Sequence, residues 1–326
     1  MLSSMIFIGN GFDVAHGYKT RYKDFYNNCD ELKTLATSGS LLCKHILDNI
    51  KGDMWQDLEC GLYEYSKMLT VQNGEGDKLS AERFKKEFKE LRSALFFYIK
   101  KVIGVSVSGN PGYSVGKLSE EWMRLEYQIV SFNYSHIVEA YSSDANLHSS
   151  GLSFNADKLI YQHGSIYNAD RGLDNTADSI VLGIDESQKV EKSHSFLYKS
   201  IQNVYSVNEL IHSMDNKDVY IIYGCSMGAS DAFYYKELFG KNKRDKTYII
   251  YGYKDEALDL IKENVIEYAG RINPFKADNN NEVFFIDSSK MDALQKTKEA
   301  INMALNRDVI KWLWCLIDGF DIIVKR

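Results

Sequence analysis

Two hydrophobic patterns alternate along the chain: short apolar runs, and longer stretches with apolar residues every three or four positions. The first apolar run, Ile6 to Ile8, leads into Gly9-Asn10-Gly11 and then into about a dozen residues that contain little to stop a helix. Glycines at such a turn permit positive φ and a close approach of the backbone. The pattern predicts a strand, a tight turn and a helix at the start of the chain.

A long helical stretch is expected next. From 22 to about 107, apolar residues recur at helical spacing, interrupted by the polar, glycine-containing segment 71–77. This pattern predicts an all-helical insertion, or cap, after the first strand-helix unit. Within it, Trp55 and Glu59 lie one helical turn apart, and we favour aromatic packing under a partly exposed carboxylate over a catalytic role.

Beyond a glycine- and serine-rich link at 105–115, short apolar runs end in a polar residue or glycine and alternate with helical stretches. Strands are predicted at 126–134, 158–164, 179–185, 218–224, 247–251 and 282–286, and helices at 196–213, 255–268 and 290–306. Such alternation is typical of a parallel sheet covered on both faces. We therefore predict an α/β fold with a doubly wound, mostly parallel sheet.

The domain division follows from this pattern. Residues 1–22 and 116–326 are expected to form the α/β domain, and 23–115 the helical insertion. The apolar tail, at 309–317 and 320–324, is expected to dock on the core, with self-association as the alternative.

Composition narrows the class of protein. The chain has 326 residues, a formal charge of -6 and 44% hydrophobic residues, typical of a globular protein and not of a nucleic-acid coat. The five cysteines include no C-x-x-C pair, so a zinc module or disulfide framework is not expected. No signal peptide is apparent and no apolar stretch reaches the ~18 residues of a membrane span, so we expect a cytoplasmic location without membrane contact.

Four predicted strand ends carry candidate chemistry, because ligands of an open parallel sheet bind beyond the carboxyl ends of its strands. These ends are Gly9-Asn10-Gly11, Phe132-Asn133-Tyr134, His163-Gly164 and Gly224-Cys225-Ser226. They offer turn backbone for phosphate oxygens, an amide, an imidazole and a hydroxyl. The set suits a nucleotide better than a metal, although the dinucleotide fingerprint G-x-G-x-x-G is incomplete because position 14 is valine.

Each candidate also has a purely structural interpretation. Asn133 can cap a turn, and His163 can be a buried structural histidine or a general base that works near pH 7. Asp13, Asp185 and Asp231 lie near predicted strand ends and could bind a divalent ion. That last possibility keeps a metal-dependent nuclease or phosphoesterase open.

The motifs carry a family resemblance. The sequence resembles the AbiH-type bacterial phage abortive-infection family in Ile8 to Asp13, His16-Gly17, Thr20, Tyr22, Phe25, Trp55, Asp57-Leu58-Glu59, Phe132-Asn133-Tyr134, His163-Gly164, Gly224-Cys225-Ser226 and Asp231. That family in turn looks distantly similar to sirtuin-like NAD-binding proteins, including defence proteins that hydrolyse NAD. The resemblance implies a sirtuin-like variant of the Rossmann fold.

The resemblance also implies roles for individual residues. Asn133 and His163 would be catalytic, Gly9 and Gly11 would face the pyrophosphate, and Gly224 with Ser226 would bind the adenosine half. The predicted nucleotide-binding set is completed by Asn10, Phe12, Asp13 and Asp231. Two departures from the sirtuin pattern are the missing four-cysteine zinc module, which argues against protein deacetylation, and the Phe12-Asp13 pair in the glycine loop.

The leading hypothesis is an antiphage effector that hydrolyses NAD, with NAD as substrate and no bound cofactor or metal. A nucleotide-binding sensor or interaction module without chemistry is the first alternative, and the metal-dependent nuclease is the second. A homo-oligomer or a partner defence protein is expected as the assembly, and nucleic acid is not expected as a partner, although the basic loop 241–246 gives the nuclease slight support.

Overall fold

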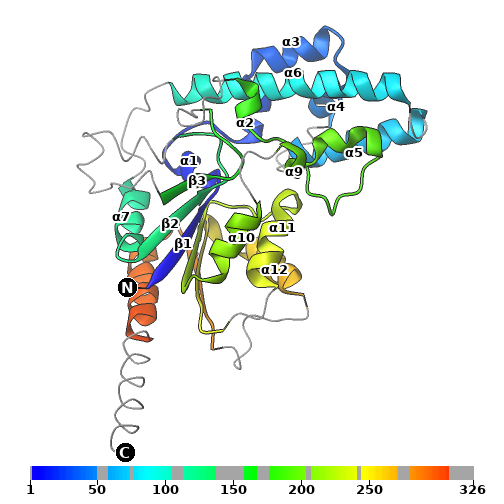
Figure 1. Cartoon of the computed structure of the whole chain (residues 1–326). Helices are drawn as coiled ribbons and strands as arrows, with labels where there is room; N and C mark the ends of the chain where they lie inside the picture. The colour runs from blue at the N-terminus through cyan, green and yellow to red at the C-terminus, as the bar shows by residue number, and fades with distance from the viewer. Residues whose placement is uncertain are drawn as a thin grey trace, which may run out of the picture.

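A six-stranded parallel sheet forms the centre of the protein (Figure 1). The computed structural model describes residues 2–49, 58–73, 77–104, 113–136, 158–166, 176–202, 207–240, 244–270 and 280–307. The strands are β1 (Ser3–Ile8), β2 (Glu126–Ser131), β3 (Leu159–Tyr161), β4 (Val219–Tyr223), β5 (Thr247–Gly252) and β6 (Glu282–Asp287). Their order is β3-β2-β1-β4-β5-β6, and all neighbours pair in parallel. The predicted parallel sheet is confirmed, and its order reverses between β1 and β4.

Alternate residues of each inner strand pack into two separate cores. In β1, Met5 and Phe7 face one core, whereas Ile6 and Ile8 face the other, as the two-residue period of a strand requires. The first core is covered by α10 (Val207–Asp215), α11 (Ala232–Phe239) and α12 (Lys254–Ala269). The second is covered by α7 (Tyr113–Trp122) and by a helix over 293–307 (Figure 1). Helices on both faces make the sheet doubly wound.

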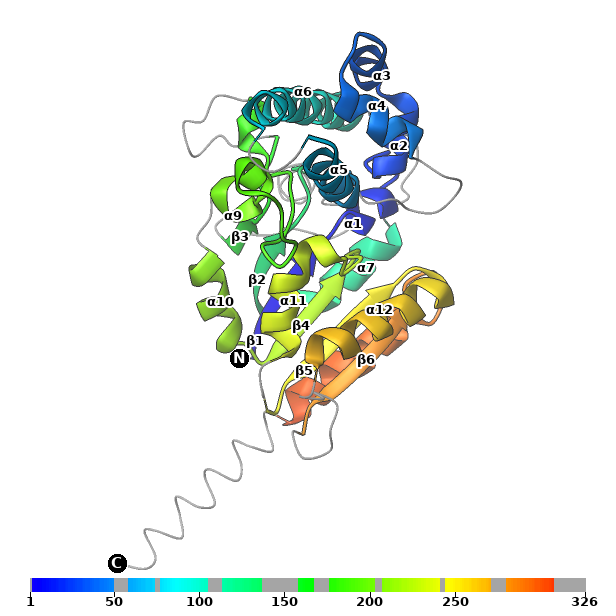
Figure 2. The same ribbon diagram turned by 90° about the vertical axis from the view of Figure 1, so that its right-hand side faces the viewer.

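A separate group of helices lies across the carboxyl ends of the strands (Figure 2). After β1 and the short α1 (Gly11–Ala15), the chain forms α2 (Tyr22–Asn28), α3 (Asp30–Thr37), α4 (Leu41–Asp48), α5 (Leu58–Asn73) and α6 (Lys78–Ile103). Apolar residues on one side of α6, among them Phe84, Phe88, Leu91 and Leu95, form a third core with α2–α5. The helical pattern predicted for this region is confirmed over its described residues, while the division into two domains stays a prediction.

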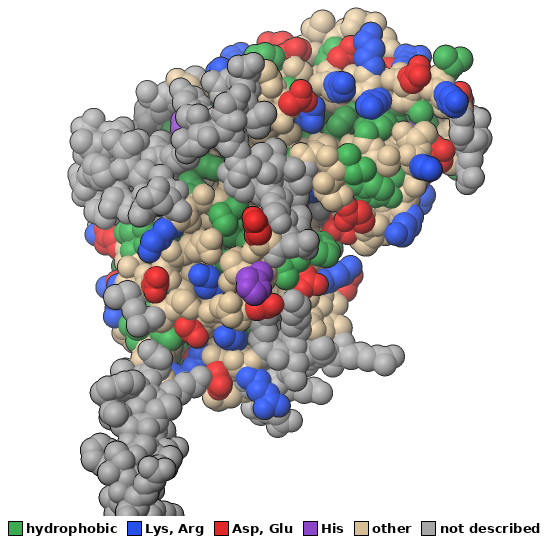
Figure 3. All heavy atoms as spheres, in the orientation of Figure 1, with side chains coloured by type: hydrophobic (Ala, Val, Ile, Leu, Met, Phe, Trp, Pro, Cys, Tyr) green, Lys and Arg blue, Asp and Glu red, His purple; other side chains and the backbone are tan. Residues whose placement is uncertain are grey.

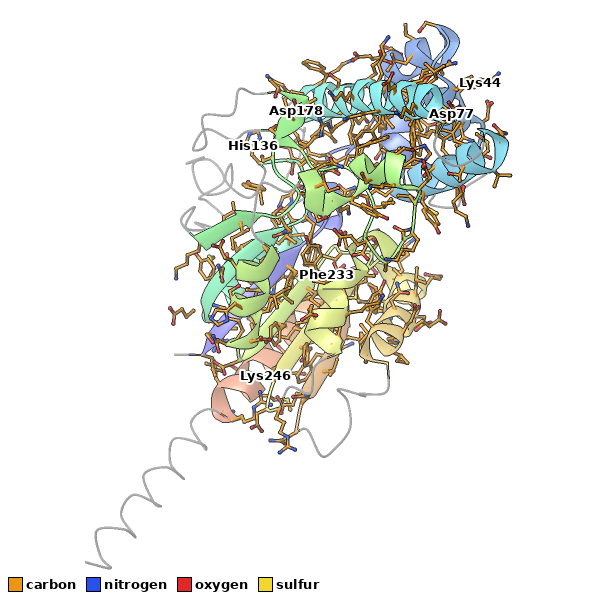
Figure 4. All side chains as sticks on the ribbon, turned by 45° about the vertical axis from the view of Figure 1, so that its right-hand side comes forward. Lys44, Asp77, His136, Asp178, Phe233 and Lys246 are labelled. Carbon is orange, nitrogen blue, oxygen red and sulfur yellow. The ribbon has the colours of Figure 1, made fainter. Side chains whose placement is uncertain are left out.

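This helical layer is tied to the segment that follows β3. Arg92 of α6 pairs with Asp178 of the 3-10 turn η4 (Ala177–Ser179) and donates to Gln202 of α9 (Lys199–Gln202) at 3.4 Å. Figure 4 labels Asp178 near one end of α6. Ile180, Leu182 and Ile184 continue the helical core from the same segment. The two parts of the fold therefore share packed side chains as well as an ion pair.

Two predicted elements are wrong in detail. Residues 179–185 do not form a strand of the sheet; they make isolated bridges, Gly164 with Ile180 and Ile184 with Tyr198. The reason is that the apolar side chains of this segment, Ile180, Leu182 and Ile184, pack in the helical core and not on the sheet. The helix predicted at 196–213 is divided, because η5 (Lys192–Leu197) ends at an extended Tyr198 before α9 and α10.

The structure describes some of the remaining predicted segments and not others. The helix expected at 290–306 lies at 293–307. Trp55, residues 241–243 of the loop 241–246 and the tail beyond 307 lie outside the described residues. No helix among the described residues is long and apolar enough to cross a membrane. On the face shown in Figure 3, basic and acidic side chains are interspersed over the helical layer.

Candidate functional site

A polar cavity lies where the helical layer meets the carboxyl ends of β1, β2 and β4. Its volume is about 100 Å³. Tyr22 of α2, Glu59 of α5, and Leu95 and Ile99 of α6 form the helical side of its wall. The cavity lies at the strand-order reversal between β1 and β4, the place where doubly wound sheets bind ligands.

Most of the predicted site residues meet in this cavity. The predicted residues that line it are Gly9, Asn10, Asp13, Asn133, His163, Gly224, Ser226 and Asp231. Gly11 and Phe12 are not part of the wall. Phe12 is fully buried, with its ring 4.4 Å from His16 and 6.2 Å from Tyr223 between centroids. Its side chain therefore belongs to the core under the site and does not face a ligand.

The glycines of the two turns pack against each other. A Cβ on Gly9 would lie 2.5 Å from the Gly224 carbonyl oxygen, and one on Gly11 would lie 2.5 Å from the Gly224 Cα. Gly224 has a φ of 69°, and a Cβ there would lie 2.6 Å from the Phe12 nitrogen. Gly9 and Gly11 donate their N–H groups to the carbonyls of Tyr223 and Gly224, each at 2.9 Å. These glycines thus allow two strand ends to pack closely. Because the N–H groups of Gly9 and Gly11 already donate to protein carbonyls, they are not free to bind the phosphate oxygens for which they were predicted.

Asn133 is held by two acceptors. Its Nδ2 donates to the Gly9 carbonyl at 3.0 Å and to the Asp13 carboxylate at 2.8 Å. Its Oδ1 is buried and has no hydrogen-bond partner among the described residues. Since both acceptors require the NH₂ group, the amide orientation is fixed and Oδ1 is the atom left for a ligand.

Asp13 is a buried carboxyl group whose charge is weakly compensated. It is 2% exposed. Burial raises its pKa to about 7, although hydrogen bonds from Ser135, Asn133 and Thr20 oppose the shift. The Thr20 hydroxyl has a single hydrogen and lies 2.5 Å from Asn10 Oδ1, which competes with Asp13 for it, and Asn10 Nδ2 donates to the Thr20 carbonyl at 3.1 Å. This pair joins the turn after β1 to the segment before α2.

On another part of the wall, four charged or titratable side chains form a chain of contacts. His163 Nε2 lies 3.0 Å from Asp231 Oδ1. Lys199 Nζ lies 2.8 Å from the same Asp231 oxygen and 2.9 Å from Glu59 Oε1. His163, Lys199 and Glu59 are each less than a tenth exposed. We call these four residues the buried charge chain.

The charge chain fixes the ionisation of two of its members, Asp231 and Lys199. Burial alone would raise the pKa of Asp231, but Lys199 and then His163 outweigh it and hold that pKa well below its usual range. Burial alone would lower the pKa of Lys199, but Asp231 and then Glu59 raise it well above its usual value. Asp231 is therefore an ionised carboxylate at neutral pH, and Lys199 is a permanent cation.

The outer part of the wall is formed by the turn after β4. Ser226 is exposed, whereas Cys225 is buried and its burial raises the thiol pKa to about 12. Met227 adopts a positive φ of 52°, and its carbonyl accepts hydrogen bonds from Tyr268 at 2.7 Å and Asn264 at 3.2 Å. The neutral thiol is a poor nucleophile, so Ser226 is the group of this turn that a ligand can reach.

The three aspartates proposed for a metal do not gather. Asp13 binds Asn133, Asp231 binds Lys199, and Asp185 accepts from the backbone of Ser187 at 2.8 Å. Among the residues that the structure describes, no group of three or more His, Cys, Asp or Glu side chains could hold a metal ion. Asp185 thus lies apart from the cavity that Asp13 and Asp231 line, and the metal-dependent alternative stays a prediction.

Some site residues were not recognised as such from the sequence. Lys199 falls inside a predicted helix, where a lysine is ordinarily a solvated surface residue, and no local pattern marks it. Glu59 was assigned a packing role, yet it lines the cavity and pairs with Lys199. Their partners lie far away along the chain, so neither role could be recognised from local spacing.

Fold and site together define a doubly wound α/β protein with a polar cavity at its topological switch point. The family model described as "Bacteriophage abortive infection AbiH" matches residues 5–253, well over half of the chain and all of the elements that line the cavity. The chain belongs to this abortive-infection family. A comparison with curated proteins found no match. The AbiH resemblance is confirmed, while the sirtuin-like similarity stays a prediction.

Proposed function

We propose that this member of the AbiH family acts in antiphage abortive infection by hydrolysing the N-glycosidic bond of NAD or a closely related nucleotide. Family membership supports the defence role. The strand order β3-β2-β1-β4-β5-β6 supports a nucleotide, because it is the order of the doubly wound sheets that bind dinucleotides at the reversal point. The reaction itself is inferred from the cavity.

The observation that carries the proposal is the unpartnered, buried Oδ1 of Asn133. A buried polar atom without a partner costs about 1–3 kcal/mol, so it favours a ligand that supplies a donor. An amide oxygen accepts a hydrogen bond from a hydroxyl or a water molecule. A ribose hydroxyl and the attacking water of a hydrolysis are both such donors.

The reaction needs a water molecule, a proton acceptor and a stabilised cation. The water oxygen bonds to C1′ of the ribose as the bond from C1′ to the nicotinamide nitrogen breaks, and nicotinamide leaves as a neutral molecule with the bonding electron pair. The proton of the water passes to the imidazole of His163, which Asp231 holds through a contact of 3.0 Å with Nε2. Asp13, with a pKa of about 7, is the second acceptor in the same cavity.

The charge of the cavity suits the transition state. Three carboxyl groups, those of Asp13, Glu59 and Asp231, line the wall, and the permanent cation Lys199 contacts two of them, Glu59 and Asp231. Positive charge develops on the ribose as the glycosidic bond breaks. Preoriented carboxylates in a site of low dielectric stabilise such charge and act more strongly on the transition state than on a neutral product.

The same carboxyl groups disfavour phosphate inside the cavity, so the phosphates of the dinucleotide are expected at its rim. Anionic phosphates are disfavoured beside three carboxyl groups, and the N–H groups of Gly9 and Gly11 are already paired. In this proposal the reacting ribose and its nicotinamide ring face the cavity, and the phosphates and the adenosine half lie outward along Ser226.

Nicotinamide release from NAD by the purified protein tests the proposal. Asn133→Ala and His163→Ala should each reduce release by about 10²-fold or more while circular dichroism shows that both variants remain folded. Asn28→Ala and His212→Ala are matched controls on exposed positions and should retain the wild-type rate.

The outcomes separate the alternatives. Loss in both site variants with full activity in both controls supports hydrolysis at this cavity. A wild-type protein that NAD stabilises against heat but that releases no nicotinamide would favour the nucleotide-binding sensor. Equal release from wild type and both site variants would overturn the assignment of the site.

A further inference from the structure

The buried charge chain connects elements that are far apart in the sequence. Glu59 lies in the first turn of α5, Lys199 begins α9, and Asp231 ends the 3-10 turn η6 (Ala229–Asp231) after β4. His163 follows β3 at the sheet edge. One ammonium group, Lys199 Nζ, thus joins the helical layer to the turn that faces the predicted catalytic histidine.

The chain is a tightly coupled unit because its central ion is fully enclosed. Lys199 is 6% exposed, and it contacts Glu59 at 2.9 Å and Asp231 at 2.8 Å. Removing one member of a buried ion group leaves an uncompensated charge, which is far more costly than losing a surface pair. Each carboxylate therefore depends on Lys199, and the position of Lys199 depends on both carboxylates.

The coupling reaches His163 through a single oxygen. Asp231 Oδ1 is the atom that contacts both Lys199 Nζ and His163 Nε2. A shift of Lys199 towards or away from α5 changes the orientation of that carboxylate, and with it the contact that orients the imidazole ring. Positioning by such a second layer of contacts is a common requirement for a histidine in proton transfer.

We infer that Lys199 and Glu59 are positioning residues that make the geometry of His163 depend on the seating of α5 over the cavity. The helical layer then controls the site as well as covering it. A partner that displaces the first turn of α5 would separate Glu59 from Lys199 and alter the Asp231–His163 contact. This inference rests on the proposed function only for the catalytic role of His163; the coupling between α5 and the sheet edge is a property of the fold.

Hydrogen–deuterium exchange of the full chain, read by mass spectrometry, tests the coupling without any ligand. Glu59→Gln keeps the shape of the side chain and leaves Lys199 and Asp231 as a neutral pair, so the protein should fold. Exchange should rise about tenfold in peptides from 58–73 and also in peptides that contain His163 or 229–231. Glu64→Gln, at an exposed position of the same helix, is the control and should change neither region.

Variants of the central lysine sharpen the test. Lys199→Met should raise exchange in both regions more than Glu59→Gln does, and Lys199→Arg, which keeps the charge, should restore part of the protection. A rise confined to 58–73 in Glu59→Gln would overturn the inference, as would unchanged exchange in both regions. If Lys199→Met does not fold, Glu59→Gln and Lys199→Arg still decide between these results.

Nicotinamide release, measured on the same variants, separates this inference from the proposed function. Glu59→Gln and Lys199→Met should lower kcat, with Lys199→Arg recovering part of it. If the wild type releases no nicotinamide, the proposed reaction fails while the exchange data still decide the coupling. If the wild type is active and the kcat of Lys199→Met is unchanged, the positioning role is overturned.

Discussion

Asn133 donates its side-chain amide to the Asp13 carboxylate across 2.8 Å, and this contact joins the end of β2 to the helix that follows β1. The second hydrogen of the same NH₂ group goes to the Gly9 carbonyl. Asp13 therefore determines which atom of Asn133 faces the cavity. A residue first assigned to nucleotide binding has, in the structure, a direct role in orienting the predicted catalytic amide.

Replacing Asp13 should weaken ligand binding in proportion to the loss of this contact. In a His163→Ala background, which prevents turnover, Asp13→Ala should weaken NAD binding about tenfold, because the Asn133 amide loses one of its two acceptors. Asp13→Asn retains an acceptor oxygen and should weaken binding less. Isothermal titration calorimetry measures both, and equal affinity for Asp13→Ala and the parent would contradict the orienting role.

The raised pKa of Asp13 predicts that its contribution to the free energy of unfolding falls as the pH rises, the opposite of the usual behaviour of a carboxyl group. Its pKa is about 7 in the folded protein and about 3.8 when exposed, so between these values the folded state binds more protons than the unfolded state. The stability contributed by protonated Asp13 is fully present below pH 4 and is lost as the pH rises through 7, by up to about 4 kcal/mol.

Chemical denaturation at several pH values measures this contribution as a difference between proteins. Asp13→Asn cannot ionise, so the difference in unfolding free energy between it and the wild type should grow from pH 4 to pH 8. Asp48→Asn, at an exposed position, is the matched control and should follow the wild type. A difference that stays constant with pH would mean that Asp13 is ionised throughout this range.

The sequence was sufficient for the sheet and for much of the site because both rest on local patterns. Apolar runs alternating with helices predicted a parallel sheet, and the polar ends of those runs predicted which residues would meet at its edge. The strand predicted at 179–185 failed because its apolar residues serve the helical core instead of the sheet. An apolar run indicates burial but does not identify the partner.

The charge chain shows what local patterns could not supply. Lys199 and Asp231 are 32 residues apart, and Glu59 lies a further 140 residues away from Lys199 in the sequence. Their pairing depends on how α5, α9 and the turn after β4 pack together. The sequence likewise indicated that positions 9 and 224 need glycine. Only the structure shows the reason, which is that the two turns contact each other.

That contact makes the glycines sensitive to a single methyl group. Gly224→Ala places a Cβ 2.6 Å from the Phe12 nitrogen at a residue with positive φ, so we expect a loss of more than about 2 kcal/mol in unfolding free energy. Gly11→Ala should be similarly destabilising, since its Cβ would lie 2.5 Å from the Gly224 Cα. Both atoms that would be struck belong to the backbone, which cannot rotate away.

Gly61→Ala is the matched control for this prediction. Gly61 lies inside α5, and the nearest atom to its added Cβ is 3.8 Å away in the Ile46 side chain. Alanine favours a helix over glycine by about 0.5–1 kcal/mol, so this variant should be as stable as the wild type or slightly more so. Urea denaturation compares the three variants, and a Gly224→Ala protein as stable as Gly61→Ala would show that the turns are not in close contact.

The excess of carboxyl groups in the cavity predicts a preference for the oxidised dinucleotide. The nicotinamide ring carries a positive charge in NAD⁺ and none in NADH, and Asp13, Glu59 and Asp231 line the wall against the single permanent cation Lys199. The His163→Ala variant should therefore bind NAD⁺ about 5- to 10-fold more tightly than NADH. This ratio corresponds to roughly 1 kcal/mol, the interaction of two unit charges about 4 Å apart at the dielectric constant of water. The preference should increase from pH 6 to pH 8, because Asp13 ionises in that range, and Asp13→Asn should remove the increase.

Calorimetric titrations with NAD⁺, NADH and ADP-ribose at both pH values measure this preference. Tighter binding of NADH, or of ADP-ribose, would mean that the cavity does not take the nicotinamide end of the molecule.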